Sequence, residues 1–252
     1  MTAAIHVLPT AEAMARAAAE FVGAVAAEAC QTRGRFTVAL AGGATPAPLY
    51  EKLASPTHAR RLAWEGWQVY WSDERCVPPD HAESNYGLAR WALLDRVPIP
   101  AGHIHRLRGE ATPERAAEEY ERDVSQVSRD SFPVFDLILL GLGEDGHTAS
   151  LFPGTAALQE EHRLVMANWV PQLDAHRLTF TLPLINAARV VAFLVDGEAK
   201  AAAVRQVLRP AAEAAALPAA RVQPGSGSPH WFLTAAAASW LGPEAGKATH
   251  RP

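Results

Sequence analysis

The sequence is poor in cysteine, with only Cys30 and Cys76 among 252 residues. Two cysteines without paired spacing exclude a disulfide-rich secreted scaffold and a cysteine-based zinc site. The sequence also lacks an excess of basic residues, since 23 Lys and Arg face 27 Asp and Glu and the formal net charge is −4. Because proteins that bind a nucleic-acid backbone usually carry a basic excess, no nucleic acid is expected as a partner.

Long apolar runs are missing as well. No segment approaches the ~20 consecutive apolar residues that a membrane-spanning helix needs, so no membrane partner is expected. Residues 1–9 lack the basic and apolar regions of a signal peptide, which favours a cytoplasmic protein. A chain of this length, 49% hydrophobic, can bury a core without disulfides or metal. We expect a single domain over residues 1–252 and a monomer, with a dimer as the alternative.

What the sequence does contain is an alternation of short apolar strands and amphipathic helices. Strands are expected at residues 36–41, 67–71, 134–140, 163–170, 177–182, 189–195 and 231–233, and helices at 10–30, 46–53, 84–94, 112–127 and 198–208. This alternation predicts an α/β protein, a three-layer α/β/α sandwich with a largely parallel, Rossmann-like sheet. In such sheets the ligand binds at the carboxyl ends of the strands. The Ala/Pro-rich stretch 209–230 is expected to form a peripheral helix and loop without readable chemistry.

The first strand end with candidate chemistry is the turn of Gly42 and Gly43. Glycines let the backbone turn tightly and approach a ligand, and free N–H groups at the start of the following helix attract an anion. Thr45 adds a hydroxyl. The segment predicts a phosphate loop, with an ordinary strand-to-helix turn as the alternative. It matches neither a Walker loop nor a dinucleotide fingerprint, so a nucleotide cofactor is not indicated.

Charged residues follow the strand at 67–71, where Asp73 and Arg75 stand in a run of three. Arg75 could bind a phosphate through two hydrogen bonds, and Asp73 could accept hydrogen bonds from sugar hydroxyls or act as a base. A solvated turn or a capping Asp is the alternative. Two further cations, Arg177 at the start of a strand and Lys200 at the start of a helix, could add positive charge to a phosphate pocket. A solvated cation is the alternative for each.

The most informative segment follows the most apolar strand and reads GLGEDGHTASLFP over residues 141–153. It places Gly143, Asp145, Gly146 and His147 close together. An imidazole with a pKa of about 6.5 can take up a proton at neutral pH, and a neighbouring carboxylate can fix its tautomer. We therefore favour His147 as a general base over a surface His in a glycine-rich turn.

Several common motifs do not occur. The chain has no H-E-x-x-H, no Cys/His cluster and no G-x-S-x-G turn, so neither a metal site nor a serine hydrolase is indicated. Because the net charge is negative, the tryptophans are expected in the core rather than on a base-stacking platform. This expectation covers Trp64, Trp67, Trp71 and Trp91.

Together these segments resemble the 6-phosphogluconolactonase family of the pentose phosphate pathway. Five stretches carry the resemblance, in that family's order: LAGGATP at 40–46, WSDERCVPPDHAESN at 71–85, DLILLGLGEDGHTASLFPG at 136–154, RLTFTLPLINAA at 177–188 and VDGEAKA at 195–201. The family usually has Ser where this chain has Ala44, which removes one hydroxyl from the phosphate loop. The resemblance implies a NagB/ribose-5-phosphate-isomerase-like fold that needs no cofactor and no metal.

The resemblance further implies the hydrolysis of a small phosphorylated sugar lactone, 6-phospho-D-glucono-1,5-lactone, to 6-phosphogluconate. His147 would activate the water, and Asp73 or Asp145 would orient His147 or hold the sugar hydroxyls. Backbone N–H groups from Gly143 to Gly146 would face the oxyanion. The phosphate would be held by Gly42, Gly43, Thr45, Arg75 and Lys200, with Arg177 as a further contact.

Two alternatives stay open. A glucosamine-6-phosphate deaminase or isomerase would share the fold and the phosphate pocket. Those enzymes continue after the His with an apolar residue and Asn-Glu-Pro, whereas this chain continues with Thr148-Ala149-Ser150. A non-catalytic sugar-phosphate sensor would normally carry a DNA-binding module, and only about 35 residues precede the first expected strand.

Overall fold

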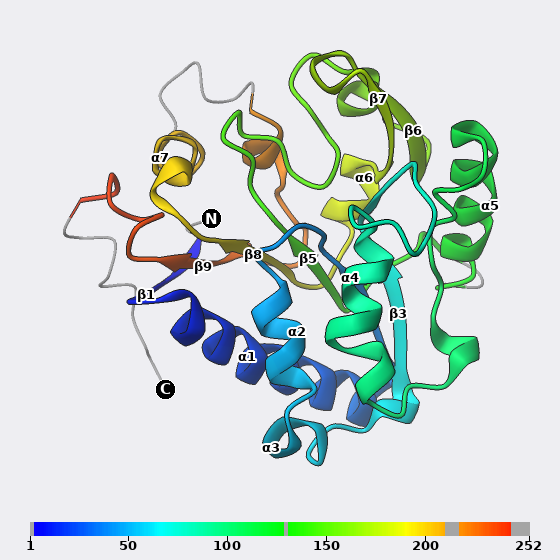
Figure 1. Ribbon diagram of the computed structural model, residues 1–252, viewed down its shortest axis with the longest axis vertical. Helices are drawn as coiled ribbons and strands as arrows, with labels where there is room; N and C mark the ends of the chain where they lie inside the picture. The colour runs from blue at the N-terminus through cyan, green and yellow to red at the C-terminus, as the bar shows by residue number, and fades with distance from the viewer. Residues whose placement is uncertain (1–2, 129–130, 210–216, 243–252) are drawn as a thin grey trace.

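The centre of the fold is a six-stranded parallel sheet (Figure 1). A computed structural model describes residues 3–128, 131–209 and 217–242. In spatial order the strands are β1 (Ala4–Leu8), β9 (His230–Thr234), β8 (Val191–Val195), β5 (Leu137–Leu140), β2 (Phe36–Leu40) and β3 (Trp67–Trp71). Every neighbouring pair is parallel, which confirms the predicted sheet. The edge strand β1, which is half-buried, was not predicted from the sequence.

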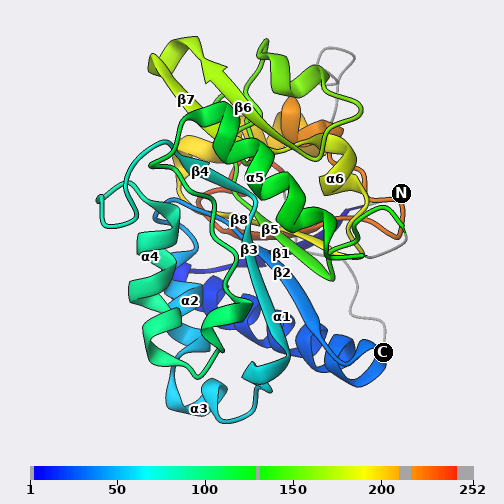
Figure 2. The ribbon, with the colours of Figure 1, turned by 90° about the vertical axis from the view of Figure 1, so that its right-hand side faces the viewer.

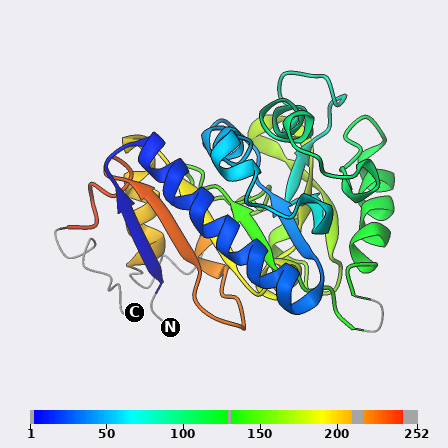
Figure 3. The same cartoon turned by 90° about the horizontal axis from the view of Figure 1, so that it is seen from below.

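Helices cover both faces of this sheet, as the sequence predicted (Figures 2 and 3). On one side lie α1 (Ala11–Arg33), α2 (Ala47–Leu53), α3 (Pro56–Ala59) and α4 (Asn85–Ala92). On the other side lie α5 (Pro113–Ser125), α6 (Leu182–Asn186) and α7 (Ala201–Leu208). Short 3-10 turns connect them at η1 (Trp64–Gly66), η2 (Leu94–Arg96), η3 (Ala101–His103), η4 (Ala156–Gln159), η5 (Pro171–Leu173), η6 (Glu198–Lys200) and η8 (Pro218–Arg221).

Local sequence explains where the longest helix begins and ends. The hydroxyl of Thr10 accepts a hydrogen bond from the N–H of Ala13, which satisfies one of the free donors of the first turn of α1. Gly34 ends the helix with φ +73°, and its N–H donates to the carbonyl of Cys30. Glycine adopts this left-handed conformation at little cost.

A second sheet of three antiparallel strands packs beside α5. It consists of β4 (Asp73–Arg75), β7 (Ala175–Phe180) and β6 (Val165–Val170). The sequence predicted strands close to β6 and β7 but placed the second two residues late, since Leu182 already begins α6. It described Asp73 to Arg75 only as a charged strand end. That run is too short and too polar to show strand periodicity, and it is a strand because it pairs with β7.

Most of the large aromatic side chains are buried. Trp64, Trp67 and Trp71 lie in the core as expected, whereas Trp91 does not, since it is 58% exposed on α4. The guanidinium of Arg96 lies 5.0 Å from the centroid of the Trp91 ring, so the exposed ring makes a cation–π contact at the surface. None of the helices in the described ranges is long and apolar enough to cross a membrane.

The strand order identifies the edge where a ligand would bind. The chain passes outward from β2 to its neighbour β3, and then returns across the sheet to β5 on the other side of β2. A reversal of this kind opens a crevice at the carboxyl ends of the two strands that flank it, here β2 and β5. The glycine turn that follows β2 and the loop with His147 that follows β5 therefore start side by side.

Candidate functional site

The loop after β5 holds His147 against a carboxylate. Nδ1 of His147 lies 2.6 Å from Oδ1 of Asp145, and the same oxygen accepts a hydrogen bond from the backbone N–H of His147 at 3.1 Å. The imidazole also stacks on the ring of Phe152, with 4.1 Å between centroids. Because an ionised carboxylate only accepts hydrogen bonds, we assign the proton of the neutral imidazole to Nδ1. Nε2 forms no hydrogen bond within the described ranges and can accept a proton.

Two glycines give this loop its shape. A Cβ on Gly143 would lie 2.0 Å from Nδ1 of His147 and 2.5 Å from Oδ1 of Asp145, so only glycine leaves room for the pair. Gly146 has φ +77°, which allows the turn just before His147. The N–H of Gly143 donates to the carbonyl of His147, and the N–H of Gly146 donates to the carbonyl of Gly143.

These two hydrogen bonds correct one expectation. From the sequence, the backbone N–H groups of Gly143 to Gly146 were expected to face an oxyanion, but those of Gly143 and Gly146 are already used within the loop. In the same turn, the N–H groups of Glu144 and Asp145 donate no hydrogen bond to another described residue. Only these two donors of the turn are therefore open to an oxyanion.

A segment in which the sequence shows no candidate chemistry supports the same turn. The N–H of Ala219 in η8 donates to the carbonyl of Gly146 at 3.1 Å. The side chain of Leu217 packs so closely on Gly146 that a Cβ there would lie 2.9 Å from it. Residues 217–222 therefore brace the loop that carries His147, while 210–216 of the same Ala/Pro-rich stretch lie outside the described residues.

Asp73 occupies a different environment from Asp145. It is buried, and its Oδ2 accepts a hydrogen bond from the hydroxyl of Ser150 at 2.7 Å. The amide of Asn85 donates to the backbone carbonyl of Asp73 at 2.8 Å and lies 3.4 Å from Oδ1. No hydrogen bond joins Asp73 to His147 in the described structure. Of the two carboxylates that the sequence proposed, Asp145 is the one that contacts the imidazole.

Glu74, to which the sequence analysis gave no role, anchors the segment that follows it. Its buried carboxylate accepts hydrogen bonds from the backbone N–H groups of Arg75, Asn85 and Tyr86, and from the hydroxyl of Ser84. Burial raises the pKa of Glu74 above its usual value, and the three backbone N–H donors oppose that shift. Glu74 therefore ties the start of α4 to β4, between Asp73 and Arg75.

Two arginines face each other across the small sheet. Arg75 of β4 and Arg177 of β7 are register partners. Burial and the neighbouring charge of Arg75 lower the pKa of Arg177 below its usual value. Arg75 donates to the carbonyl of Glu83, and neither guanidinium forms an ion pair with a carboxylate in the described part of the chain. Like charges at this position repel, and a bound anion would relieve that repulsion.

The structure places the remaining candidates as follows. Gly43 has φ +79°, and Gly42 packs against the amide of Asn85. Thr45 is half-buried beside them. Lys200, which precedes α7, lies 3.5 Å from the carboxylate of Glu144 in the loop after β5. The described structure contains no hydrogen bond between Lys200 and the glycine turn after β2.

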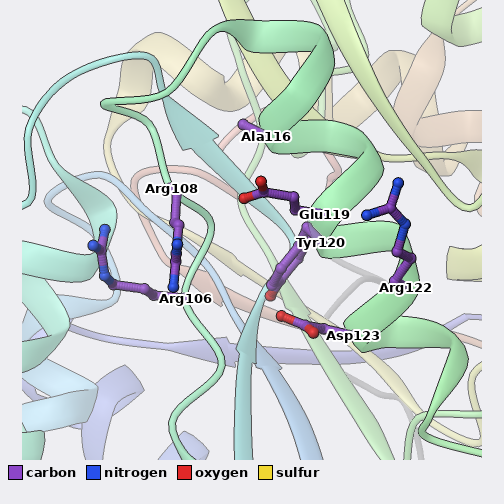
Figure 4. A pocket seen from close by; sticks show the side chains of 7 residues that line it. All are labelled: Arg106, Arg108, Ala116, Glu119, Tyr120, Arg122 and Asp123. Atoms are coloured by element: carbon purple, nitrogen blue, oxygen red, sulfur yellow. The ribbon is translucent and has the colours of Figure 1, made fainter.

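The cavity shown in Figure 4 lies elsewhere, between α5 and the segment that carries Arg106 and Arg108. It encloses about 290 Å³, and none of the candidate residues lines it. Its basic side chains are balanced by acidic ones, since Arg106, Arg108 and Arg122 share it with Glu119 and Asp123. Within the described ranges, no group of three or more His, Cys, Asp or Glu side chains is arranged to hold a metal ion.

Comparisons with known proteins agree on one family. The family model described as "Glucosamine-6-phosphate isomerases/6-phosphogluconolactonase" matches residues 9–231. A 6-phosphogluconolactonase of Nostoc sp. is 42% identical over 246 residues, which cover 96% of this chain and 99% of that protein. The human 6-phosphogluconolactonase is 44% identical over 212 residues, covering 83% of this chain and 82% of the relative. The structure of 6-phosphogluconolactonase from Trypanosoma brucei superposes with a TM-score of 0.84 and 28% identity over 96% of this chain and 99% of that one.

Proposed function

The chain belongs to the glucosamine-6-phosphate isomerase/6-phosphogluconolactonase family, and from this premise we propose that it hydrolyses 6-phospho-D-glucono-1,5-lactone to 6-phosphogluconate. The two relatives compared above over more than 80% of their lengths are both named for the lactonase activity. The observation that carries the proposal is the pair of Asp145 and His147 at the carboxyl end of β5, with its free Nε2.

The reaction is the hydrolysis of a cyclic ester, and His147 supplies the proton transfers. Nε2 removes a proton from a water molecule as the water oxygen attacks C1 of the lactone. The resulting imidazolium returns that proton to the ring oxygen as the bond between C1 and the ring oxygen breaks. Asp145 holds Nδ1–H and stabilises the imidazolium in between. Acid–base assistance of this kind is typically worth about 10²–10⁴-fold in rate.

Negative charge develops on the carbonyl oxygen in the tetrahedral intermediate. The backbone N–H groups of Glu144 and Asp145 bond to no other described residue, and we assign them to that oxygen. Asp73 has a different task in this proposal. Its carboxylate is fixed by Ser150 and Asn85 rather than by His147, so we assign it to the hydroxyls of the sugar.

The 6-phosphate is held at a distance from the reacting carbon. The guanidinium groups of Arg75 and Arg177, which have no carboxylate partner among the described residues, and the glycine turn of Gly42 and Gly43 supply its donors, with Thr45 and Lys200 as further contacts. Binding energy gained at the phosphate holds C1 against the water and His147. Because the phosphate contacts position the substrate for His147, we expect the chain to hydrolyse phosphorylated lactones much better than unphosphorylated ones.

The decisive experiment measures proton release after the addition of freshly prepared phosphogluconolactone, because the product is an acid. We expect turnover well above spontaneous hydrolysis, and much weaker turnover of the unphosphorylated lactone. Ammonia release from glucosamine 6-phosphate would instead support a deaminase, against which the Thr148-Ala149-Ser150 continuation argues. Binding of sugar phosphates without any turnover would support a sensor and contradict the proposed activity.

A further inference from the structure

Asn85 lies between the two parts of the candidate site that handle different ends of the substrate. The residue is 1% exposed at the start of α4. On one side its amide nitrogen donates to the backbone carbonyl of Asp73 and approaches Oδ1 of the same residue. On the other side the amide packs against the glycine turn after β2, so that a Cβ on Gly42 would lie 1.9–2.2 Å from Oδ1, Cγ and Nδ2.

The stability of the fold alone does not favour an Asn side chain at position 85. Both atoms of Asp73 that the amide contacts are acceptors, which fixes Nδ2 toward Asp73 and Oδ1 away from it. Oδ1 is then buried without a hydrogen-bond partner in the described structure. A buried acceptor that lacks a partner destabilises the fold, so its retention calls for a reason beyond packing.

The backbone of Asn85 already stabilises the fold. Its N–H donates to the carboxylate of Glu74, which secures α4 whatever side chain stands at this position. Ser84 caps the helix through its own hydroxyl, which accepts from the N–H of Gly87. The side chain of Asn85 is therefore left with one evident task, to join Gly42 to Asp73.

We propose that Asn85 is a positioning residue that couples phosphate binding to the placement of Asp73. When the phosphate orders the turn of Gly42 and Gly43, the turn presses on the Asn85 amide, and the amide holds Asp73 against the hydroxyls of the sugar. The free energy of phosphate binding thereby helps to orient the lactone ring. This inference rests on the proposed function and adds to it the link between its two subsites.

The first test compares two substrates in one variant. Asn85→Ala removes the link without touching the phosphate donors or His147. For phosphorylated lactone we expect kcat to fall by about 10–100-fold, because a misplaced substrate reacts slowly even when it is bound. For unphosphorylated lactone, which loses only the direct hydrogen bond from Asn85 to Asp73 and has no phosphate to act through the link, kcat/KM should fall by less than about fivefold. Gln68→Ala removes another half-buried side-chain amide, which is hydrogen-bonded to His105, and should change neither value.

A double-mutant cycle tests the contact itself. Gly42→Ala adds a Cβ whose three nearest atoms all belong to the Asn85 side chain, so it should lower turnover of the phosphorylated lactone by about 10-fold. In the Asn85→Ala background those atoms are gone, and Gly42→Ala should cost less than about twofold more. Asn85→Ser serves as a second variant if Asn85→Ala fails to fold, since it keeps the backbone bond to Glu74 and a small polar side chain.

The outcomes separate this inference from the proposed function. If the parent chain hydrolyses neither lactone, the proposed function fails and the inference falls with it. If the parent is active, equal losses on both lactones would show a merely structural role for Asn85. An unchanged kcat for the phosphorylated lactone, or additive effects of the two substitutions, would also overturn the coupling. A loss that is clearly larger for the phosphorylated lactone, together with non-additivity, supports it.

Discussion

The imidazole of His147 lies directly over Gly143, where a Cβ would be 2.0 Å from Nδ1 and 2.3 Å from Cε1. The two residues are four positions apart in a loop, and the N–H of Gly143 also donates to the carbonyl of His147. The absence of a side chain at Gly143 is thus what allows the imidazole to reach Asp145. This contact sets the position of the proposed base.

Gly143→Ala should therefore expel the imidazole from its place beside Asp145. We expect kcat for the phosphorylated lactone to fall by about 10–100-fold, with KM nearly unchanged, because misplacement of a catalytic group is costly. Gly141→Ala is the matched control, since a Cβ there meets no atom within 4 Å. Steady-state kinetics of the two variants test the contact, and similar activities would contradict it.

His147→Ala removes the proposed base altogether. We expect kcat to fall by about 10²–10⁴-fold with a modest change in KM, since the phosphate donors remain. His162→Ala, at an exposed position, should leave both constants unchanged. Near-normal turnover of His147→Ala would remove this residue as the base.

Arg177→Ala leaves Arg75 as the only guanidinium of the register pair. A charge-assisted hydrogen bond contributes about 1.5–3 kcal/mol, so KM for the phosphorylated lactone should rise by about 10–150-fold. The kcat/KM for the unphosphorylated lactone should not change, and Arg75→Ala should behave in the same way. Arg115→Ala on the exposed face of α5 is the control. An equal loss on both lactones would count against a phosphate site.

Glu144→Gln releases Lys200 from its only ion pair in the described structure. Exposed pairs of this type contribute about 0.2–1 kcal/mol, so KM for the phosphorylated lactone should fall by about 1.4–5-fold as Lys200 turns to the phosphate. Glu118→Gln, which breaks an exposed pair with Arg122 on α5, should have no effect. A rise in KM would show that Glu144 itself assists binding.

The thiol of Cys76 should react slowly at ordinary pH. Burial raises its pKa to about 11, so the reactive thiolate is scarce at pH 8 and increases until the pH passes that value. In a Cys30→Ser background, alkylation by iodoacetamide at pH 8 should be at least about 100-fold slower than that of free cysteine. A rate that levels off between pH 8 and 9 would contradict the raised pKa.

Much of the fold could be predicted because its signals are local. The apolar runs of β2, β5 and β8 and the amphipathic pattern of α5 each lie within one short segment. β4 was not predicted because its three charged residues do not show the alternation of apolar and polar residues that indicates a strand. Trp91 was placed wrongly because its aromatic character says nothing about which side of α4 it occupies.

The sequence by itself determined which segments carry polar and glycine residues at strand ends, since strand, turn and side-chain chemistry are properties of neighbouring residues. Only the tertiary structure decided how those segments meet. Antiparallel pairing of β4 with β7 brings Arg75 opposite Arg177, and the turn at Gly146 brings Asp145 rather than Asp73 to His147. The tertiary structure likewise places Asn85 between Gly42 and Asp73. Such contacts depend on packing between residues far apart in the chain and on the direction of each side chain, which no local pattern specifies.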